Sequence, residues 1–180
     1  MQKTLFKKYL RITSSIIFIS FLFLSFVMLI FFSNYWQTEK RNLLRKNAES
    51  VAAIAADSVT SVEDNVYTIH TDRMKAFIAA FSDNIDADIF VTKLNGQIVI
   101  ASYDSTSGIN DGRNVSEEIM KKAISGGYNN QGTMGGIYSQ PYYIVGVPIN
   151  VVNIDGSKTA IGAVFTAYNV RSFNSFRGEI

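Results

Sequence analysis

The chain has 180 residues, of which 47% are hydrophobic, and its 17 basic and 15 acidic residues give a formal net charge of +2. It contains no cysteine, which excludes disulfide bonds, thiolate metal sites and thiol catalysis. Four basic residues precede residue 12, so the rest of the chain carries 13 basic and 15 acidic residues and lacks the positive surface that nucleic acids require. We therefore expect no nucleic-acid partner, and no motif indicates a cofactor.

Residues 12–32 form an apolar run without a charged side chain, in which Thr and Ser are the polar members. Because a helix rises about 1.5 Å per residue, the run spans roughly 31 Å, close to the hydrocarbon core of a bilayer. The hydroxyl groups can donate hydrogen bonds to carbonyl groups of their own helix, which lowers their cost in lipid. The run therefore predicts a transmembrane helix, with the lipid bilayer as a partner.

The short segment before this run, residues 1–11, is basic and contains no acid. Positive charge on a short flanking segment favours the cytoplasmic side. We therefore expect a cytoplasmic tail and an extracytoplasmic domain in the cell membrane, with a single pass in this chain. A cleavable signal peptide is the alternative. Against it, the run exceeds the usual length of about 7–15 residues, no A-x-A pattern follows, and Tyr35 and Trp36 are typical of an interfacial anchor.

Beyond the span, residues 36–69 contain no Gly or Pro and keep a helical period, which predicts one long helix that breaks between residues 61 and 71. A second, short helix is expected at residues 72–81. The apolar stripe of the long helix has two interpretations: it packs on its own domain, or its first half also pairs with a second copy in a parallel homodimer. The stripe consists of Leu44, Ala48, Val51, Ala55, Val59, Val62, Val66 and Ile69, and the first four would form the dimer seam.

The second half of the chain changes to strand patterns. Asn95-Gly96 between two apolar runs predicts a hairpin with a type I′ turn. After a loop at residues 103–113, the sequence at residues 114–117 resembles a capping box that opens a short helix to residue 125. The expected strands are residues 89–94, 97–102, 134–138, 142–149 and 160–168, with Pro148 indicating an edge or strand end. The fold class is therefore α+β: a five-stranded antiparallel sheet with helices on one face.

This order of elements, with three motifs, resembles a single Cache domain, the PAS-like extracytoplasmic sensor module of bacterial membrane receptors. The motifs are residues 87–99 (Ala-Asp-Ile-Phe-Val-Thr-Lys-Leu-Asn-Gly-Gln-Ile-Val), 143–149 (Tyr-Ile-Val-Gly-Val-Pro-Ile) and 161–165 (Ile-Gly-Ala-Val-Phe). The resemblance covers about residues 36–175. It is most similar to the amino-terminal portion of sensor histidine kinases.

The resemblance implies a signal-sensing role in a two-component system. Such receptors continue into a second span, a HAMP linker and a kinase core, so residues 176–180 are expected to begin the connection to a second span of a longer protein. No catalytic constellation is visible in this chain. Enzyme activity, and contact with a response regulator, would belong to the missing kinase part. The alternatives are the sensor module of a chemoreceptor or a cyclase, and a ligand-free envelope module for dimerisation or interaction.

By analogy with Cache domains, the ligand pocket is expected on the sheet face that the long helix does not cover, roofed by residues 103–130. Tyrosine side chains there would give an apolar wall with polar tips, suited to an unidentified small organic ligand. Core packing is the alternative for each of them. Strand alternation places Tyr142 and Tyr143 on opposite faces. The candidates are Tyr103, Tyr128, Tyr138, Tyr142, Tyr143 and Tyr168.

Three carboxylates, Asp83, Asp86 and Asp88, lie close together in the sequence just before the first expected strand. Oxygen ligands at such spacing could hold Ca²⁺ or Mg²⁺, although the spacing is not that of an EF-hand loop. The end of a helix and the start of a strand explain them equally well, so they are weak metal candidates. The sole histidine, His70, is interpreted as a structural or surface residue.

Overall fold

The computed structural model describes residues 2–62, 66–69, 71–102, 114–153 and 155–170. The chain divides into two compact units, Met1–Lys40 and Arg41–Ile180. The helices are α1 (Gln2–Asp57), α2 (Thr71–Ile85) and α3 (Glu117–Gly126). The strands are β1 (Val59–Val62), β2 (Val66–Ile69), β3 (Asp88–Lys93), β4 (Ile98–Ala101), β5 (Tyr128–Gly132), β6 (Tyr142–Val152) and β7 (Lys158–Asn169).

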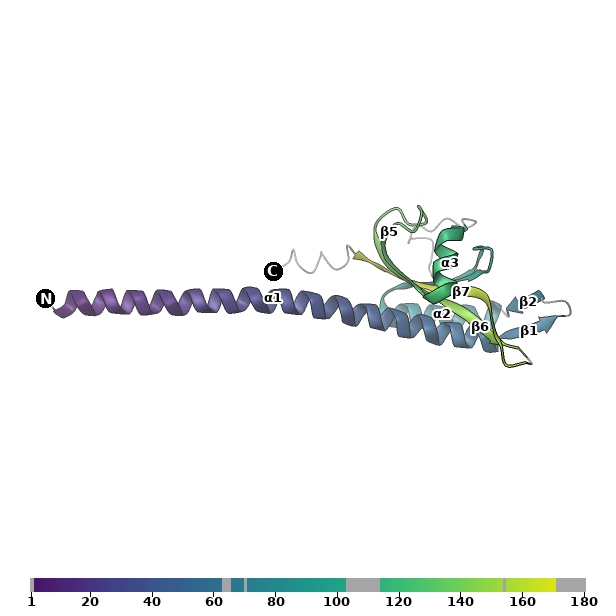
Figure 1. Cartoon of the computed structure of the whole chain (residues 1–180), viewed down its shortest axis with the longest axis horizontal. Coiled ribbons are helices and arrows are strands. Elements are labelled where there is room, and N and C mark those ends of the chain that lie inside the picture. The colour runs from purple at the N-terminus through teal and green to yellow at the C-terminus, as the bar shows by residue number, and fades with distance from the viewer. Residues whose placement is uncertain (1, 63–65, 70, 103–113, 154, 171–180) are drawn as a thin grey trace. The chain divides into compact units, whose positions relative to one another are not determined.

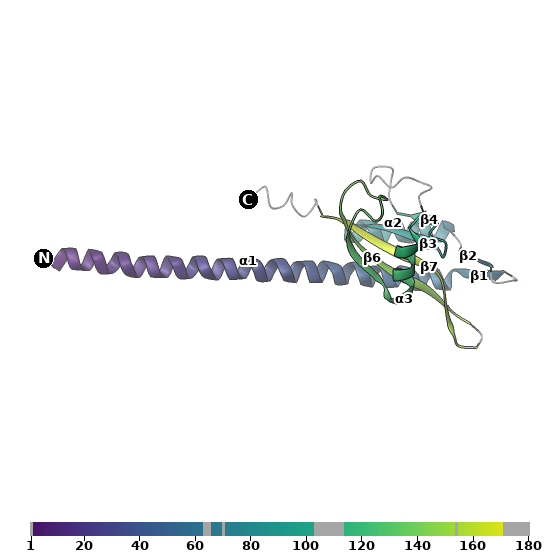
Figure 2. The same ribbon diagram turned by 45° about the horizontal axis from the view of Figure 1, so that its top comes forward.

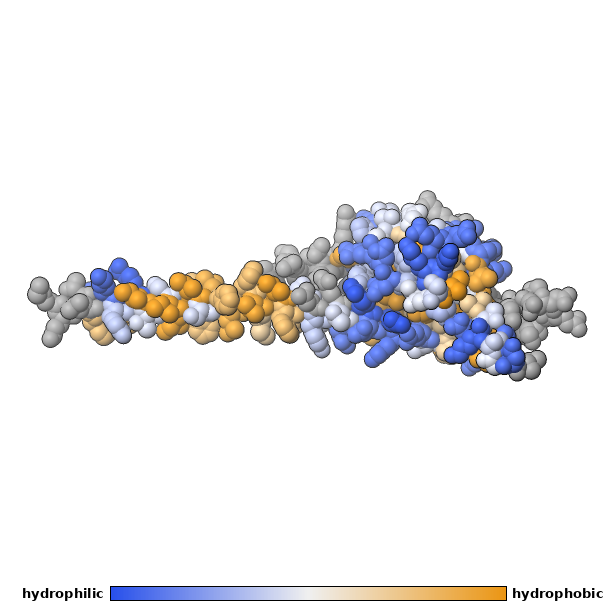
Figure 3. All heavy atoms as spheres, in the orientation of Figure 1, coloured by the Kyte–Doolittle hydropathy of each residue, from blue (hydrophilic) through white to orange (hydrophobic). Residues whose placement is uncertain are grey.

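The first unit consists of the amino-terminal part of α1, which contains the predicted span. Within the described residues, α1 is the one helix long and apolar enough to cross a membrane, and none of its most apolar window is buried, unlike the core helix of a soluble protein. Apolar side chains cover much of this part of α1 on the face seen in Figure 3. Thr13 Oγ1 donates to the Tyr9 carbonyl at 3.0 Å and Ser20 Oγ to the Ile16 carbonyl at 2.9 Å. In both bonds a hydroxyl group donates to a carbonyl group of its own helix, as expected from the sequence.

The long helix ends earlier than predicted. α1 stops at Asp57, and the antiparallel hairpin of β1 and β2 occupies the following residues, where the sequence analysis placed a continuing helix. Val59, Thr60 and Val62 are β-branched, as are Val66, Thr68 and Ile69, and such residues lose side-chain freedom in a helix and favour strands. Apolar residues continue at spacings of three and four beyond Asp57, but there this pattern wrongly predicted a helix.

The second unit is built on the predicted five-stranded antiparallel sheet, whose strand order is β4-β3-β7-β6-β5 (Figures 1 and 2). β6 and β7 form the longest pairing, from Tyr142↔Asn169 to Val152↔Lys158. One strand was wrongly predicted: β5 is Tyr128–Gly132, whereas residues 134–138 form turns. Met134, Gly135 and Gly136 have φ values of 52°, 68° and 88°, which no β-strand accommodates.

The hairpin between β3 and β4 is present, but its turn differs from the expected type I′. The amide of Gly96 donates to the Lys93 carbonyl at 3.0 Å, so Leu94 and Asn95 are the central residues of the turn. Gly96 follows with a φ of 82°, and Asn95 is not among the residues with positive φ. This arrangement is the turn followed by a left-handed glycine that is typical of three-residue hairpin loops.

Helices cover both faces of the sheet, which corrects the expectation of helices on one face. α2 and the α1 residues from Leu44 to Ala55 pack against Ile89, Val91 and Val164. α3 lies on the other face (Figure 1). Its Met120 and Ala123 pack against Phe90 and Phe165. α3 begins after Ser116, whose side chain makes no capping hydrogen bond, so the capping box is absent. The architecture remains α+β and fits a PAS-like domain.

Gly146 of β6 makes room for the aromatic layer on the α3 side. A Cβ atom at this position would meet the ring of Phe165 inside contact distance and would also crowd the Cβ of Tyr128. Phe165 is fully buried and stacks on Phe90 at a centroid distance of 5.2 Å, so its ring has little freedom to move.

We predict that Gly146→Ala lowers the free energy of unfolding by about 2 kcal/mol, because overpacking a closed core forces rings away from their preferred positions. Gly132→Ala is the matched control, since a Cβ there meets no atom within 4 Å. Urea unfolding of both variants measures the difference. Equal stability of the two variants would contradict the packing role of Gly146.

Candidate functional site

Three of the six candidate tyrosines lie together on the sheet face away from α1, where they form part of the hydrophobic core. Tyr128, Tyr138 and Tyr142 are 7%, 1% and 9% exposed and belong to the same cluster as Phe90 and Phe165. The rings of Tyr138 and Tyr142 stack with centroids 3.9 Å apart, and Tyr128 meets Phe165 edge-on at 6.3 Å. The Asn169 amide nitrogen lies 3.5 Å from the Tyr142 hydroxyl and donates to it. The cluster therefore has an apolar body with a polar margin.

The other candidates are elsewhere. Tyr143 and Tyr168 are paired across β6 and β7 and pack on the face that α1 covers. The guanidinium of Arg41 lies over the Tyr143 ring, 5.1 Å from its centroid. Tyr103 lies outside the described residues, together with the first part of the predicted roof, residues 103–113. His70 and residues 176–180 also lie outside them.

Asp88 joins the tyrosine cluster, a placement that the sequence analysis missed. It is the first residue of β3 and shares a face with Phe90, because side chains alternate along a strand. Burial raises the pKa of Asp88 to about 6, the Tyr138 hydroxyl opposes this shift, and the negative charge of Asp86 adds to it. The sequence did contain a signal for this placement: residues 88, 90 and 92 alternate along β3, so the side chain of Asp88 has to share the face of Phe90.

The three predicted metal candidates do not form a metal site. Asp83 and Asp86 are exposed, and Asp86 adopts a φ of 50° in the turn between α2 and β3. The part of the chain that the structure describes contains no group of three His, Cys, Asp or Glu side chains placed to hold a metal ion. Termination of α2 and entry into β3 therefore account for the two exposed carboxylates.

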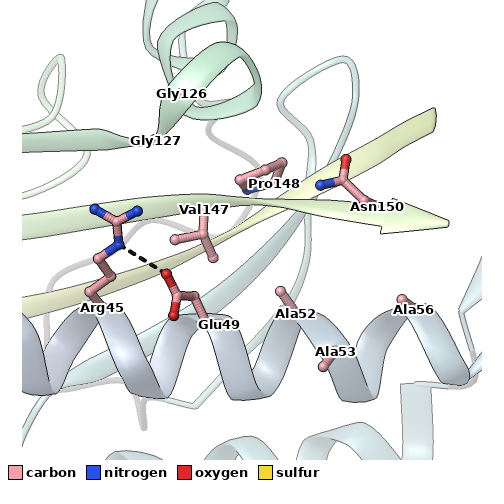
Figure 4. Close-up of a pocket in the computed structure, with 10 residues that line it drawn as sticks. All are labelled: Arg45, Glu49, Ala52, Ala53, Ala56, Gly126, Gly127, Val147, Pro148 and Asn150. Atoms are coloured by element: carbon pink, nitrogen blue, oxygen red, sulfur yellow. Dashed lines mark hydrogen bonds and ion pairs between the residues drawn. The ribbon is translucent and has the colours of Figure 1, made fainter. Parts of the chain in front are cut away.

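A separate groove of about 400 Å³ lies between α1 and the part of β6 that β5 leaves uncovered (Figure 4). β5 pairs with β6 only up to Gly146, so the following residues have no strand on that side, as Pro148 indicated. None of the five candidate tyrosines that the structure describes lines the groove. An exposed ion pair between Arg45 and Glu49, 2.9 Å long, borders it. Its lining residues are Arg45, Glu49, Ala52, Ala53, Ala56, Gly126, Gly127, Val147, Pro148 and Asn150.

The four residues of the predicted dimer seam are part of the core of their own domain. Leu44, Ala48, Val51 and Ala55 are 0%, 0%, 1% and 0% exposed. Side chains without exposed surface cannot contact a second chain. The stripe is therefore explained by packing within one chain, and a dimer would have to use other positions of α1.

No protein-family model matches the chain, and no curated protein matches it. Among solved structures, the chain is similar to the sensor domain of the V. cholerae histidine kinase DctB, with 14% sequence identity and a TM-score of 0.44. The similar region covers 58% of this chain and 39% of that chain.

The raised pKa of Asp88 predicts a dependence of stability on pH. In the unfolded chain the carboxyl group has its ordinary pKa of 3.8, so the folded state holds the proton more tightly. Stability from this group is therefore lost as the pH rises from about 4 to about 6, and by pH 7.5 the loss amounts to about 2 kcal/mol after allowance for partial exposure.

Asp88→Asn should remove this dependence, and the variant should exceed the wild type in stability by about 2 kcal/mol at pH 7.5 but equal it below pH 4. Denaturant unfolding between pH 4 and 7.5 measures the difference. Asp83→Asn makes the same chemical change on an exposed side chain and serves as control. A wild type whose stability rises steadily over this pH range would contradict the assignment.

Proposed function

We propose that this chain is the extracytoplasmic sensing portion of a two-component sensor histidine kinase, which binds a small ligand on the α3 side of its sheet and relays binding through α1. The observation that carries the proposal is that a single helix, α1, contains both the predicted span and part of the domain core. One uninterrupted helix includes the apolar residues 12–32 and, from Leu44 to Ala55, residues of the domain core. A change in the packing of that core therefore acts directly on the helix that enters the membrane.

Two contacts support the proposed link between sheet and helix. The buried hydroxyl of Thr166 in β7 donates to the Leu44 carbonyl at 3.2 Å, and Arg41 lies over the ring of Tyr143 in β6. Both strands also contribute to the ligand side, with Phe165 and Ala167 flanking Thr166 and Tyr142 preceding Tyr143. A shift of β6 or β7 caused by a ligand is thus transmitted to α1 through neighbouring residues of the same strands.

We propose that the basic tail lies in the cytoplasm and the domain outside the cell membrane, in accord with the positive charge before the span. The kinase part, and through it the response regulator, would lie in the remainder of a longer protein. Ligand binding shifts such a receptor only if the two states of the domain have different affinities. A chemoreceptor or a cyclase remains an alternative parent, because the same sensing portion serves each of these outputs.

The test of ligand binding compares two neighbouring tyrosines on opposite faces. The full chain in lipid nanodiscs is screened against small organic compounds by thermal shift, and the affinity of each compound that stabilises it is measured. Tyr142→Phe removes one hydroxyl at the proposed site and should weaken binding about tenfold, the value of one hydrogen bond of about 1.4 kcal/mol. Tyr143→Phe should leave the affinity unchanged. Equal effects of the two changes, or no stabilising compound, would contradict the site.

We also propose a parallel homodimer, with a seam different from the buried one. Leu43, Asn47, Ser50 and Ile54 follow each other at spacings of 4, 3 and 4, and Leu43 is 40% exposed. These residues form a second stripe beside the stripe that faces the sheet.

The dimer is tested by disulfide crosslinking in membranes, which is simple because the chain has no cysteine of its own. Ser50→Cys should form crosslinked dimers, whereas Glu49→Cys, equally exposed but on the groove side of α1, should not. Equal crosslinking at both positions, or none at Ser50→Cys, would rule out this seam.

A further inference from the structure

We propose that Asp88, with the stacked rings of Tyr138 and Tyr142, forms a subsite for the ammonium group of a small organic ligand. This inference rests on the proposed sensor function and specifies the chemical class of its ligand. Three adjacent strands bring the groups together: Asp88 of β3 is paired with Ala167 of β7, and Tyr142 of β6 is paired with Asn169 of β7. Since residues 167 and 169 lie on one face of β7, the carboxyl group and the Tyr142 ring lie on that face as well.

The side chains of Asp88, Tyr138 and Tyr142 also interact with one another. The Tyr138 hydroxyl favours the ionised form of Asp88. Burial and, after it, the charge of Asp88 raise the pKa of Tyr142. Asn169 donates to the Tyr142 hydroxyl at the edge of this group. Asp88 and Asn169 are only partly buried, whereas both tyrosines are buried. Asp88 therefore lies at the margin of the aromatic cluster and keeps some exposed surface, the side from which the head group of a ligand would approach.

The negative charge of the Asp88 carboxylate favours a cationic ligand over an anionic one. Asp88 Oδ2 is shielded from solvent, and burying a carboxylate is costly unless it is paired with positive charge. The charged neighbour that acts on the pKa of Asp88 is Asp86, another acid. The ion pairs Arg45–Glu49 and Lys122–Glu118 both involve other acids. An anionic ligand would add further negative charge, whereas an ammonium group pairs with the carboxylate and is also attracted to electron-rich aromatic rings.

Proton linkage gives this subsite a distinctive signature. An ammonium group favours the ionised carboxylate, so its binding below about pH 6 must displace the proton from Asp88. The titratable groups that interact with Asp88 are Asp86, Tyr138 and Tyr142. The affinity for an ammonium compound should therefore rise about tenfold between pH 5 and pH 7.5, with protons released at the lower pH. Neutral compounds show no such linkage.

The experiment uses the full chain in phosphatidylcholine nanodiscs and three probes of matched size: butylammonium, 1-butanol and butyrate. Isothermal titration at pH 5.0 and 7.5, with empty nanodiscs as reference, should show binding of butylammonium alone, about tenfold tighter at pH 7.5. Asp88→Asn should lower that affinity at least tenfold and abolish the pH dependence. Because this variant is expected to be more stable than the wild type at neutral pH, a loss of binding would not result from unfolding.

Asp155→Asn, which changes an exposed acid in the β6–β7 turn, is the control and should bind butylammonium like the wild type. The inference is overturned if butylammonium binds equally to Asp88→Asn, if its affinity does not change with pH, or if butyrate or butanol binds instead. It is also overturned if no probe binds. A third outcome separates the two proposals. If a neutral or anionic compound from the thermal-shift screen binds and Tyr142→Phe weakens its binding, while ammonium compounds do not bind, the sensor function stands and the ligand class is wrong.

Discussion

The packing of one face of α1 against the sheet is the constraint on which the rest of the second unit depends. Leu44 and Val51 supply bulk, while Ala48 and Ala55, which alternate with them along the stripe, let the helix backbone approach the strands closely. The hydroxyl of Thr166 adds a hydrogen bond from the sheet to a carbonyl of this helix. Because this face of the sheet is occupied, any ligand cavity formed by the sheet has to lie on the opposite face or at an edge.

That opposite face differs in chemistry from the α1 face. The α1 side has the aliphatic residues Ile89, Val91 and Val164 in its core, with Tyr143 and Tyr168 packed against them, whereas the core of the α3 side contains Phe90, Phe165 and three tyrosines. A mainly aliphatic core suits a permanent contact, and the buried Thr166 hydroxyl on this side has the Leu44 carbonyl as its hydrogen-bond partner. Aromatic rings with hydroxyl groups, bordered by a partly buried carboxyl group, suit a contact that forms and dissociates.

Much of the fold was predictable because its signals are local. Alternation identified β6 and β7, and Asn95-Gly96 located the first hairpin, although the turn places Gly96 alone at positive φ. The apolar composition of residues 12–32 identified the part of α1 that is long and apolar enough to cross a membrane. The failures also have physical reasons. Apolar spacing in residues 59–69 suits a helix or strands, and only their β-branched character, which favours strands, distinguishes the two.

The site was harder to predict because it depends on register between distant strands. Parity within β6 separates Tyr142 from Tyr143, but which of them lies beside Asp88 follows from the pairing of both strands with β7. β5 posed the same difficulty, since Asn129, Asn130 and Gln131 carry little strand propensity and are held by pairing with β6. Sequence identified these residues as candidates; only tertiary structure could group them.

The early end of β5 has its own structural consequence. Beyond Gly146, β6 would present an open edge to solvent, and open edges are prone to pair with other chains. Pro148 stands at this edge and lacks an amide proton, so it cannot donate to an added strand. Ala52, Ala53 and Ala56 of α1 leave the adjacent groove open instead of filling it with larger side chains. The groove therefore leaves space between α1 and β6 at the edge that β5 does not cover.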